Sequence, residues 1–411
     1  MRTLLMIAYH FPPFAGSSGV QRTLRFVQQL PAFGWKPVVL SVHPRAYEKT
    51  SEDLLREVAE GTIVERAFAV DTARQLSIAG RYPGFLARPD RWMSWWFGAV
   101  PAGLRMIREH RPAAIWSTYP IATAHRIGTT LQKMSGLPWI ADFRDPMAQD
   151  GYPEDPATWR AFDRIERAAF AAATRTVFTT RGAAAMYRDR YPAQADRISV
   201  IENGYDEESF KGITADGGPL VPGKVTLLHS GLIYPVERDP TQFFESLAAL
   251  HRAGLISPDR LCVRFRAPTH DALILDLAKR SGIEAYVECA PSIPYREALR
   301  EMMRADGLLA MQAANCNEQI PAKVYEYIRA GRPLIGLTDP DGDTADLLMR
   351  AGVRHIAPLD DVAAIGATLT SFLADLAAGT PIAPPDEAVA QHSRLSRTRE
   401  LVAVLDAAVA G

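Results

Sequence analysis

The sequence predicts an α/β protein made of two Rossmann-like domains that face each other across a cleft. Three observations lead to this fold class. Short apolar runs alternate with amphipathic helical patterns along nearly the whole chain, which is typical of parallel sheets covered by helices. The alternation stops once, in a stretch rich in Gly and Pro over residues 211–223, and then resumes. The chain of 411 residues is long enough for two domains.

The expected strands are short runs rich in β-branched, aromatic and other apolar residues. In the first half they cover residues 3–9, 37–42, 62–68, 114–118, 139–142, 176–179 and 198–201. In the second half they cover residues 225–229, 262–265, 286–289, 307–311 and 334–337. Helical patterns fill most of the intervals, including residues 20–30, 121–134, 240–251, 272–279, 295–303 and 362–377.

The expected domain organisation follows from this alternation. A first Rossmann-like domain covers residues 1–205, a linker covers 206–223, and a second Rossmann-like domain covers 224–390. A final helix within 391–411 is expected to pack back on the first domain. Ligands of such sheets bind at the carboxyl ends of the strands, so the active site is expected in the cleft between the domains.

The composition excludes several classes of protein. The 46 basic and 47 acidic residues leave a formal net charge of −1, so no global charge favours nucleic acid. The three cysteines are far apart and odd in number, which fits a reducing compartment and gives neither a metal pattern nor a disulfide framework. No run reaches the roughly 18–20 apolar residues of a membrane helix. A cytoplasmic protein is expected, with a peripheral contact to the inner face of a membrane left open.

The stretch over residues 317–333 predicts a loop, a helix and a turn into a buried strand. Pro321 suits the first helical turn, where a missing N–H has no consequence, and Gly331 suits the position just after the helix. The free amides and the positive dipole end at the helix start can hold an anion such as a phosphate. Two carboxylates bracket this start, Glu318 and Glu326, with seven residues between them.

This arrangement resembles the E-x7-E element of retaining glycosyltransferases of the GT-B fold, in particular the large family 4. The resemblance implies that Glu326 holds the ribose hydroxyls of a nucleotide and that Glu318 lies beside the donor sugar as a catalytic carboxylate. It also places Ile320, Pro321 and Lys323 in the nucleotide-binding set, where the helix start faces the diphosphate. The alternative is an amphipathic helix with two solvated Glu side chains.

A glycine-containing loop follows the first expected strand, over residues 10–20. It is similar to the "PP…GG" loop of family 4, which implies that Gly16 and Gly19 let the backbone approach the donor phosphate or sugar, although two serines here separate the glycines. A flexible turn that caps a helix is the alternative. The loop lacks G-x-G-x-x-G, and the second expected strand has no acidic residue at its end, so NAD is disfavoured.

A second loop, over residues 230–240, follows the first expected strand of the second domain. It resembles the family loop in which a glycine permits close approach and a basic residue grips the diphosphate, which implies these roles for Gly231 and Arg238. With Lys323 and the helix dipole, Arg238 could neutralise a leaving diphosphate without a metal. Pairing of Arg238 with Glu237 or Asp239 is the alternative.

Three charged residues lie at and just after the end of the strand at residues 139–142, in the segment Asp142-Phe143-Arg144-Asp145-Pro146. Charges at a strand end are costly unless they are paired or exposed in a cleft. The segment resembles a "DFRDP" signature in a subgroup of these transferases, which implies that Asp145 or Asp142 contacts the acceptor or the donor sugar as a catalytic residue. A structural Asp–Arg pair is the alternative.

Two further clusters carry weaker expectations. Trp92, Trp95 and Trp96 lie beside arginines, which suits core packing, an acceptor site or a membrane contact. Asp339 and Asp343 belong to two overlapping D-x-D pairs, but a turn followed by a helix cap explains them, so no metal site is predicted.

The expected function is transfer of a sugar from a nucleotide diphosphate sugar to an acceptor hydroxyl with retention of anomeric configuration. The resemblance implies no cofactor beyond this donor, a saccharide or lipid-linked acceptor, and a place in bacterial surface polysaccharide or glycolipid assembly. Two alternatives remain. A nucleotide-sugar epimerase shares this architecture, and a non-catalytic nucleotide-sugar-binding protein would keep Glu326 without turnover.

Overall fold

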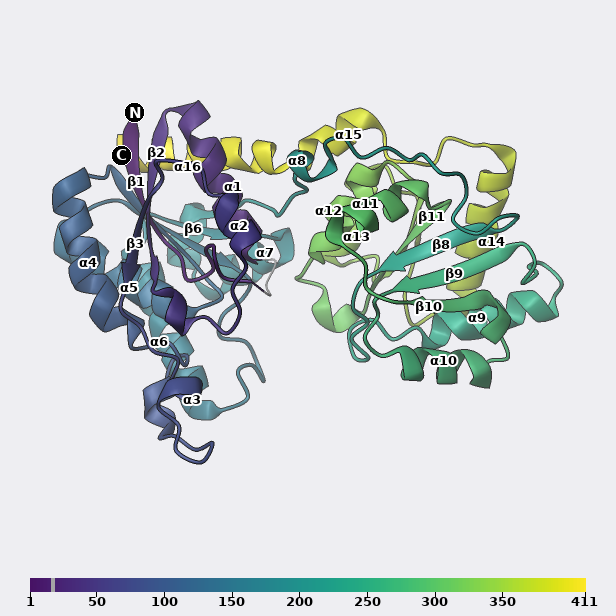
Figure 1. The fold of residues 1–411 in the computed structure, drawn as a ribbon, viewed down its shortest axis with the longest axis horizontal. Helices are drawn as coiled ribbons and strands as arrows, with labels where there is room; N and C mark the ends of the chain where they lie inside the picture. The colour runs from purple at the N-terminus through teal and green to yellow at the C-terminus, as the bar shows by residue number, and fades with distance from the viewer. Residues whose placement is uncertain (16–18) are drawn as a thin grey trace. The chain divides into compact units, whose positions relative to one another are not determined.

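The computed structural model describes residues 1–15 and 19–411, and it divides into two compact units (Figure 1). The first unit contains Met1–Asn203 together with Arg394–Gly411. The second unit contains Gly204–Ser393. Each unit holds one parallel sheet covered by helices, so the predicted α/β fold class is confirmed.

The sheet of the first unit has seven parallel strands in the order β3-β2-β1-β4-β5-β6-β7. The strands are β1 (Arg2–Ile7), β2 (Trp35–Val42), β3 (Ile63–Ala67), β4 (Ala114–Thr118), β5 (Trp139–Arg144), β6 (Arg175–Phe178) and β7 (Ile198–Val200). The helices are α1 (Gly19–Gln29), α2 (Glu52–Arg56), α3 (Thr72–Gln75), α4 (Trp95–His110), α5 (Ala122–Ser135), α6 (Pro156–Ala172), α7 (Arg181–Arg190) and α16 (Arg394–Ala410).

Both faces of this sheet are buried, which explains why its strands are nearly continuous apolar runs. In β1, Leu5 and Ile7 point to a core built with α4, α5, α6 and α7. Leu4 and Met6 point to the opposite core, built with α1 and α16. The final helix therefore covers one face of the first sheet beside α1, as expected for a helix that returns to this unit (Figure 1).

The sheet of the second unit has six parallel strands in the order β10-β9-β8-β11-β12-β13. The strands are β8 (Val225–Ser230), β9 (Leu261–Arg266), β10 (Val287–Ala290), β11 (Gly307–Gln312), β12 (Leu334–Thr338) and β13 (His355–Ala357). The helices are α8 (Glu207–Phe210), α9 (Thr241–Arg252), α10 (Asp271–Arg280), α11 (Tyr295–Arg304), α12 (Ala322–Ala330), α13 (Asp343–Arg350), α14 (Val362–Ala378) and α15 (Asp386–Gln391).

The two faces of the second sheet are covered by different helices. Helices α9, α10 and α14 pack on one face, and α11, α12 and α13 pack on the other. Helix α12 buries Val324, Tyr327 and Ile328, the apolar face that its sequence pattern favours. Burial of this face fixes the start of α12 at the carboxyl ends of the strands.

The segment over residues 206–223, expected to be a linker, belongs to the second unit. It begins with α8, and its Phe210 and Ile213 lie in the core beside α11 and α12. Two apolar side chains in a polar, Gly-rich stretch give too little periodicity to indicate this packing. Among the described residues no helix has both the length and the hydropathy needed to cross a membrane.

Candidate functional site

The predicted nucleotide site in the second unit is built where β8 ends against the start of α12. The Lys323 ammonium donates a hydrogen bond to the carbonyl oxygen of Ser230. The Ser230 amide donates to the Tyr327 hydroxyl at 2.7 Å. A parallel strand end and a helix start are thus joined by two contacts, one of which uses the predicted Lys323.

Gly231 is required by this arrangement. Its φ is +119°, in the left-handed region, and a Cβ placed on it would lie 1.7 Å from the Lys323 Nζ. Any side chain at this position would therefore displace the lysine as well as strain the backbone. The structure therefore brings together two predicted site residues, Gly231 and Lys323, that lie 92 positions apart in the sequence.

Arg238 adds a second cation beside this contact. Its side chain is buried, its Nη1 donates to the Leu232 carbonyl at 3.3 Å, and its guanidinium carbon lies 5.1 Å from the centre of the Tyr234 ring. The Nε is buried without a hydrogen-bond partner in the described part of the chain. No ion pair within the described residues joins Arg238 to Glu237 or Asp239, which disfavours the alternative of a local pair.

Lys323 and Arg238 influence each other electrostatically. Burial and the Arg238 charge lower the pKa of Lys323 to about 8, and the Glu326 charge opposes this shift. Two cations in one partly desolvated place repel each other unless an anion lies between them. The arrangement therefore favours binding of a group with multiple negative charges, such as a diphosphate.

Glu326 lies on α12, one turn after Lys323. The Tyr295 hydroxyl donates to Glu326 Oε1 at 2.7 Å and so orients the carboxylate. Tyr295 is the first residue of α11, after the loop that leaves β10. The sequence pattern did not indicate Tyr295, because its partner is 31 residues away and no local motif joins them.

Glu318, Ile320 and Pro321 lie in the segment that leads into α12. Glu318 is half-buried, and Pro321 directly precedes the first helical residue with an extended ψ of 129°. Ile320 packs against the core beneath α12. These residues form the approach to a helix start, and the first backbone amides of a helix lack intrahelical acceptors and so suit an anion.

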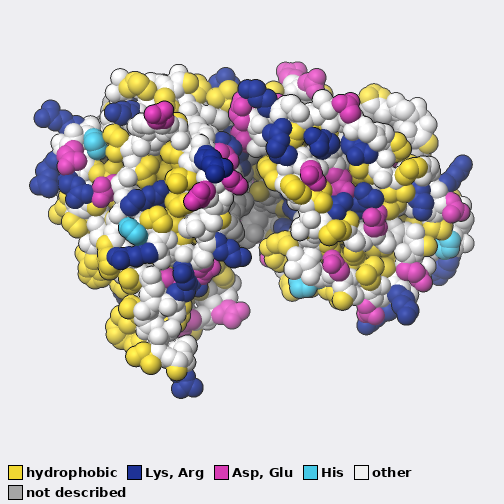
Figure 2. Space-filling model, viewed as in Figure 1, with side chains coloured by type: hydrophobic (Ala, Val, Ile, Leu, Met, Phe, Trp, Pro, Cys, Tyr) yellow, Lys and Arg dark blue, Asp and Glu magenta, His cyan; other side chains and the backbone are white. Residues whose placement is uncertain are grey.

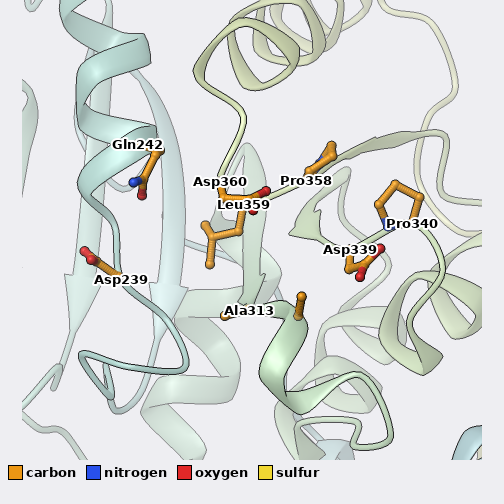
Figure 3. A pocket seen from close by; sticks show the side chains of 9 residues that line it. Asp239, Gln242, Ala313, Asp339, Pro340, Pro358, Leu359 and Asp360 are labelled. Atoms are coloured by element: carbon orange, nitrogen blue, oxygen red, sulfur yellow. The ribbon is translucent and has the colours of Figure 1, made fainter.

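A cavity of about 370 Å³ lies at the carboxyl ends of the strands in the same unit (Figure 3). Asp239 and Gln242 at the start of α9 form one side, and Asp339 after β12 and Asp360 after β13 contribute to the other. None of the predicted site residues is among those that line it. Its three carboxylates would repel a diphosphate, so this cavity is less suited to such an anion than the Arg238–Lys323 pair.

The D-x-D segment beside this cavity forms a turn, as the sequence indicates. Asp339 accepts hydrogen bonds from the Asp341 amide at 3.0 Å and from the Asn317 side-chain amide at 2.7 Å. The Asn317 hydrogen bond holds the pKa of Asp339 below its usual value. Across residues 1–15 and 19–411, no three His, Cys, Asp or Glu side chains are grouped so that they could hold a metal ion.

In the first unit, Asp142 is a structural residue. Its carboxylate is fully buried and receives hydrogen bonds at 3.0 Å from the Arg22 Nε, the Arg22 Nη2 and the Thr118 hydroxyl. Arg22 also donates to the carbonyls of Ile201 and Glu202 at 3.0 Å. The expected acceptor role of Asp142 is therefore not favoured, because Arg22 occupies the carboxylate. The expected structural Asp–Arg pair exists, with Arg22 in place of Arg144.

Arg144 and Asp145 lie at the end of β5, and the Arg144 charge acts on His10, which follows β1. Arg144 has a φ of +62°, a strained backbone conformation that is enriched at functional sites. Burial raises the pKa of Asp145, although the Arg144 charge opposes the shift. Burial and Arg144 lower the pKa of His10 to about 3, so its imidazole is neutral at pH 7. Of the two predicted aspartates, Asp145 suits a contact with a sugar or acceptor better than Asp142, whose carboxylate is bound by Arg22.

The remaining predictions for the first unit concern the glycine loop and the tryptophans. Gly19 is buried and begins α1, whereas Gly16 lies outside the described residues. Trp95 is fully buried, and Trp92 and Trp96 are half-buried against the same core. Core packing therefore explains the tryptophan cluster.

A family model described as a glycosyl transferase 4-like domain matches residues 18–204, which is nearly all of the first segment of this unit. This segment of the first unit is therefore similar to a glycosyl transferase 4-like domain. No curated protein sequence matches the chain.

Solved structures match the chain over nearly its full length. HepE of Anabaena in complex with UDP gives a TM-score of 0.68 at 12% identity, covering 99% of this chain and 100% of that one. The lipopolysaccharide outer core galactosyltransferase WaaB gives 0.62 at 13% identity, covering 98% and 99%. A protein of Listeria monocytogenes named as a UDP-N-acetylglucosamine 2-epimerase gives 0.59 at 10% identity, covering 98% and 96%.

These similarities confirm the predicted fold. The chain has the GT-B fold, and residues 18–204 are similar to a glycosyl transferase 4-like domain. At these identities the solved structures establish the fold alone. The structure of HepE with UDP bound also shows that a neighbour of this fold holds a nucleotide.

Proposed function

We propose that this chain is a retaining glycosyltransferase that moves a sugar from a nucleotide diphosphate sugar to an acceptor hydroxyl. The observation that carries the proposal is the group formed by Gly231, Arg238, Lys323 and Glu326 at the start of α12. Two cations and a helix start suit a diphosphate, and an oriented carboxylate suits a ribose. The domain match and the UDP-bound neighbour favour the same class of ligand.

The proposed reaction needs no enzyme nucleophile. The bond between the anomeric carbon and the diphosphate oxygen breaks, and its electron pair stays with the diphosphate. The acceptor oxygen forms the new bond on the same face, and its proton passes to the departing phosphate oxygen. Arg238, Lys323 and the α12 dipole stabilise the developing charge on the diphosphate. Glu318 is proposed to lie beside the donor sugar.

The acceptor is proposed to contact the first unit at Asp145. Its carboxyl group lies beside the strained Arg144 at the end of β5, and the Arg144 charge also acts on the neutral His10. A saccharide or a lipid-linked acceptor in bacterial surface polysaccharide or glycolipid assembly is proposed. Because the two cations can balance a diphosphate by themselves, the reaction is proposed to need no metal.

A thermal-shift panel of UDP, GDP, ADP, CMP and NAD tests the binding proposal. One nucleoside diphosphate is expected to raise the melting temperature, with or without EDTA. Glu326→Gln should remove most of this shift, because a neutral amide binds ribose hydroxyls more weakly than a carboxylate. Glu297→Gln, a change at an exposed carboxylate of α11, is the matched control and should keep it. Stabilisation by NAD alone would contradict the proposal.

Turnover then separates the transferase from the alternatives. A transferase should release the nucleoside diphosphate from its donor faster when a suitable acceptor is present. An epimerase would change the configuration of the donor sugar without an acceptor, and a binding protein would do neither. Loss of all activity in EDTA would overturn the metal-free reaction.

A further inference from the structure

A projection of the first unit carries exposed apolar side chains that its core does not use. We define this projection as residues 72–88, from α3 through the turn that follows to the short 3-10 helix Gly84–Ala87. Figure 1 shows α3 and its loop extending away from the sheet of this unit. The base is held by two hydrogen bonds, from the Thr72 hydroxyl to the Leu86 carbonyl at 2.8 Å and from the Thr72 amide to the Arg91 carbonyl at 2.9 Å.

Four large apolar side chains are exposed along this projection. Ile78 is 84% exposed and Phe85 is 66% exposed, while Leu76 and Tyr82 are 44% and 37% exposed. Single exposed apolar residues are ordinary on protein surfaces, but four within ten positions form a patch that favours an interaction. Figure 2 shows hydrophobic side chains gathered on this projection.

The tip presents these side chains through an ordered turn. Ile78 and Arg81 exchange two backbone hydrogen bonds, at 2.9 Å and 3.0 Å. Ala79 and Gly80 between them have positive φ values of 50° and 74°. Ile78 is therefore held at the outer end of a closed turn, where the unit offers it no apolar surface to cover.

The charge of the projection has one sign. Arg74, Arg81 and Arg88 are its only charged residues, and it contains no acidic residue. Arg88 pairs at its base with Asp155 at 3.5 Å, and the Arg74 guanidinium donates to the Tyr47 carbonyl. Arg81 at the exposed tip completes a surface of apolar side chains bordered by cations. This combination complements a bilayer that contains anionic lipids, where apolar side chains enter the headgroup boundary and arginines meet phosphates.

We propose that the projection over residues 72–88 seats the protein on the surface of an anionic membrane. Ile78 and Phe85 would enter the boundary between headgroups and acyl chains, and Arg81 would contact a lipid phosphate. The proposal goes beyond the sugar transfer and does not depend on it, since membrane seating needs neither nucleotide nor acceptor. It assigns the membrane contact to this projection and not to the tryptophan cluster, because those tryptophans pack in or against the core of the unit.

Vesicle co-sedimentation of the full chain tests this proposal. The protein is expected to bind vesicles that mix phosphatidylcholine with phosphatidylglycerol, and to bind pure phosphatidylcholine weakly. The double change Ile78→Ser/Phe85→Ser should lower the partition coefficient about tenfold or more, because much less apolar surface would leave water. Arg81→Gln should lower it about fivefold on anionic vesicles and have little effect on neutral ones. Added salt should weaken the wild-type binding.

A matched control uses two exposed apolar residues elsewhere in the same unit. Leu55 is 46% exposed on α2 and Met134 is 60% exposed on α5, and Leu55→Ser/Met134→Ser should bind vesicles as the wild type does. Circular dichroism melting checks that each variant folds, and nucleotide thermal shifts check the second unit separately. Equal vesicle binding by the wild type and the Ile78/Phe85 variant would overturn the proposal. So would a change of oligomeric state in that variant without a change in vesicle binding, which would assign the patch to a second copy of the chain.

Discussion

Lys323 lies in surroundings that destabilise its charged ammonium form, because the side chain is buried and Arg238 is nearby. Burial and Arg238 lower its pKa to about 8, well below the usual value for a lysine. Its ammonium still donates to the Ser230 carbonyl, so the positive charge is held in position before any ligand arrives. A bound anion should stabilise the charged form of this lysine, which burial alone destabilises.

The first prediction concerns the pH dependence of nucleotide binding. A bound diphosphate should raise the pKa of Lys323, so binding should take up a proton above about pH 8. Affinity should be constant below pH 8 and should fall above it, by up to about tenfold per pH unit. Isothermal titration calorimetry in two buffers of different ionisation enthalpy measures the proton uptake directly.

Lys323→Met is the control for this prediction. Without a titrating ammonium, the variant should bind the diphosphate more weakly and with an affinity that is independent of pH over the same range. A wild-type affinity that stays constant well above pH 8 would show that Lys323 does not meet the phosphates.

At the scale of elements, Arg22 joins three segments of the first unit. It lies on α1, pairs with Asp142 of β5 and donates to two carbonyls in the segment after β7. Arg22 is 4% exposed and Asp142 is fully buried. Such a pair contributes little net stability compared with apolar packing, but loss of one partner leaves a buried charge alone.

The second prediction follows from this pair. Arg22→Met should lower the free energy of unfolding by about 3–5 kcal/mol, because Asp142 would stay buried without the cation that pairs with it. Urea denaturation of the full chain measures the loss. Arg56→Met removes an exposed pair with Asp53, whose side chains are 74% and 86% exposed, and should change stability by less than about 1 kcal/mol. A small effect of Arg22→Met would show that Asp142 is neutralised in another way.

The same elements show what could be predicted from the sequence. The parallel sheets were predictable, because most of their strands are short, continuous apolar runs between amphipathic helices, a pattern typical of buried parallel strands. Strand β13 was missed because its three residues are too short for a pattern. The group around α12 was predictable because its residues lie within continuous motifs. The contacts of Arg22 with Asp142 and of Tyr295 with Glu326 were not, since they join residues 120 and 31 positions apart.

At the scale of the whole molecule, the first unit is completed by the last helix of the chain. Leu401 and Leu405 of α16 lie in the same core as Trp35 and Leu24. The Arg2 guanidinium and the Trp35 indole both donate to Asp406. Residues 394–411 are therefore part of the first unit's hydrophobic core and not an appended tail.

The third prediction tests this dependence. Leu405 is fully buried, so Leu405→Ala should destabilise the first unit by about 2–5 kcal/mol. The nucleotide-induced thermal shift of the second unit should remain. Leu395→Ala, on the same helix but 39% exposed, should cost less than about 1 kcal/mol. Equal losses in the two variants, measured by urea denaturation, would show that α16 does not complete this core.

The placement of α16 has a consequence for synthesis on the ribosome. The chain leaves the first unit at residues 203–204 and returns at 393–394. The two connecting segments are joined to each other by the ion pair of Glu202 with Arg397 and by the backbone bridge of Tyr205 with Ser393. All of residues 204–393 must be translated before α16 emerges. The nascent first unit must therefore keep one apolar face of its sheet open while the second unit is made, so it is the second unit that can mature first.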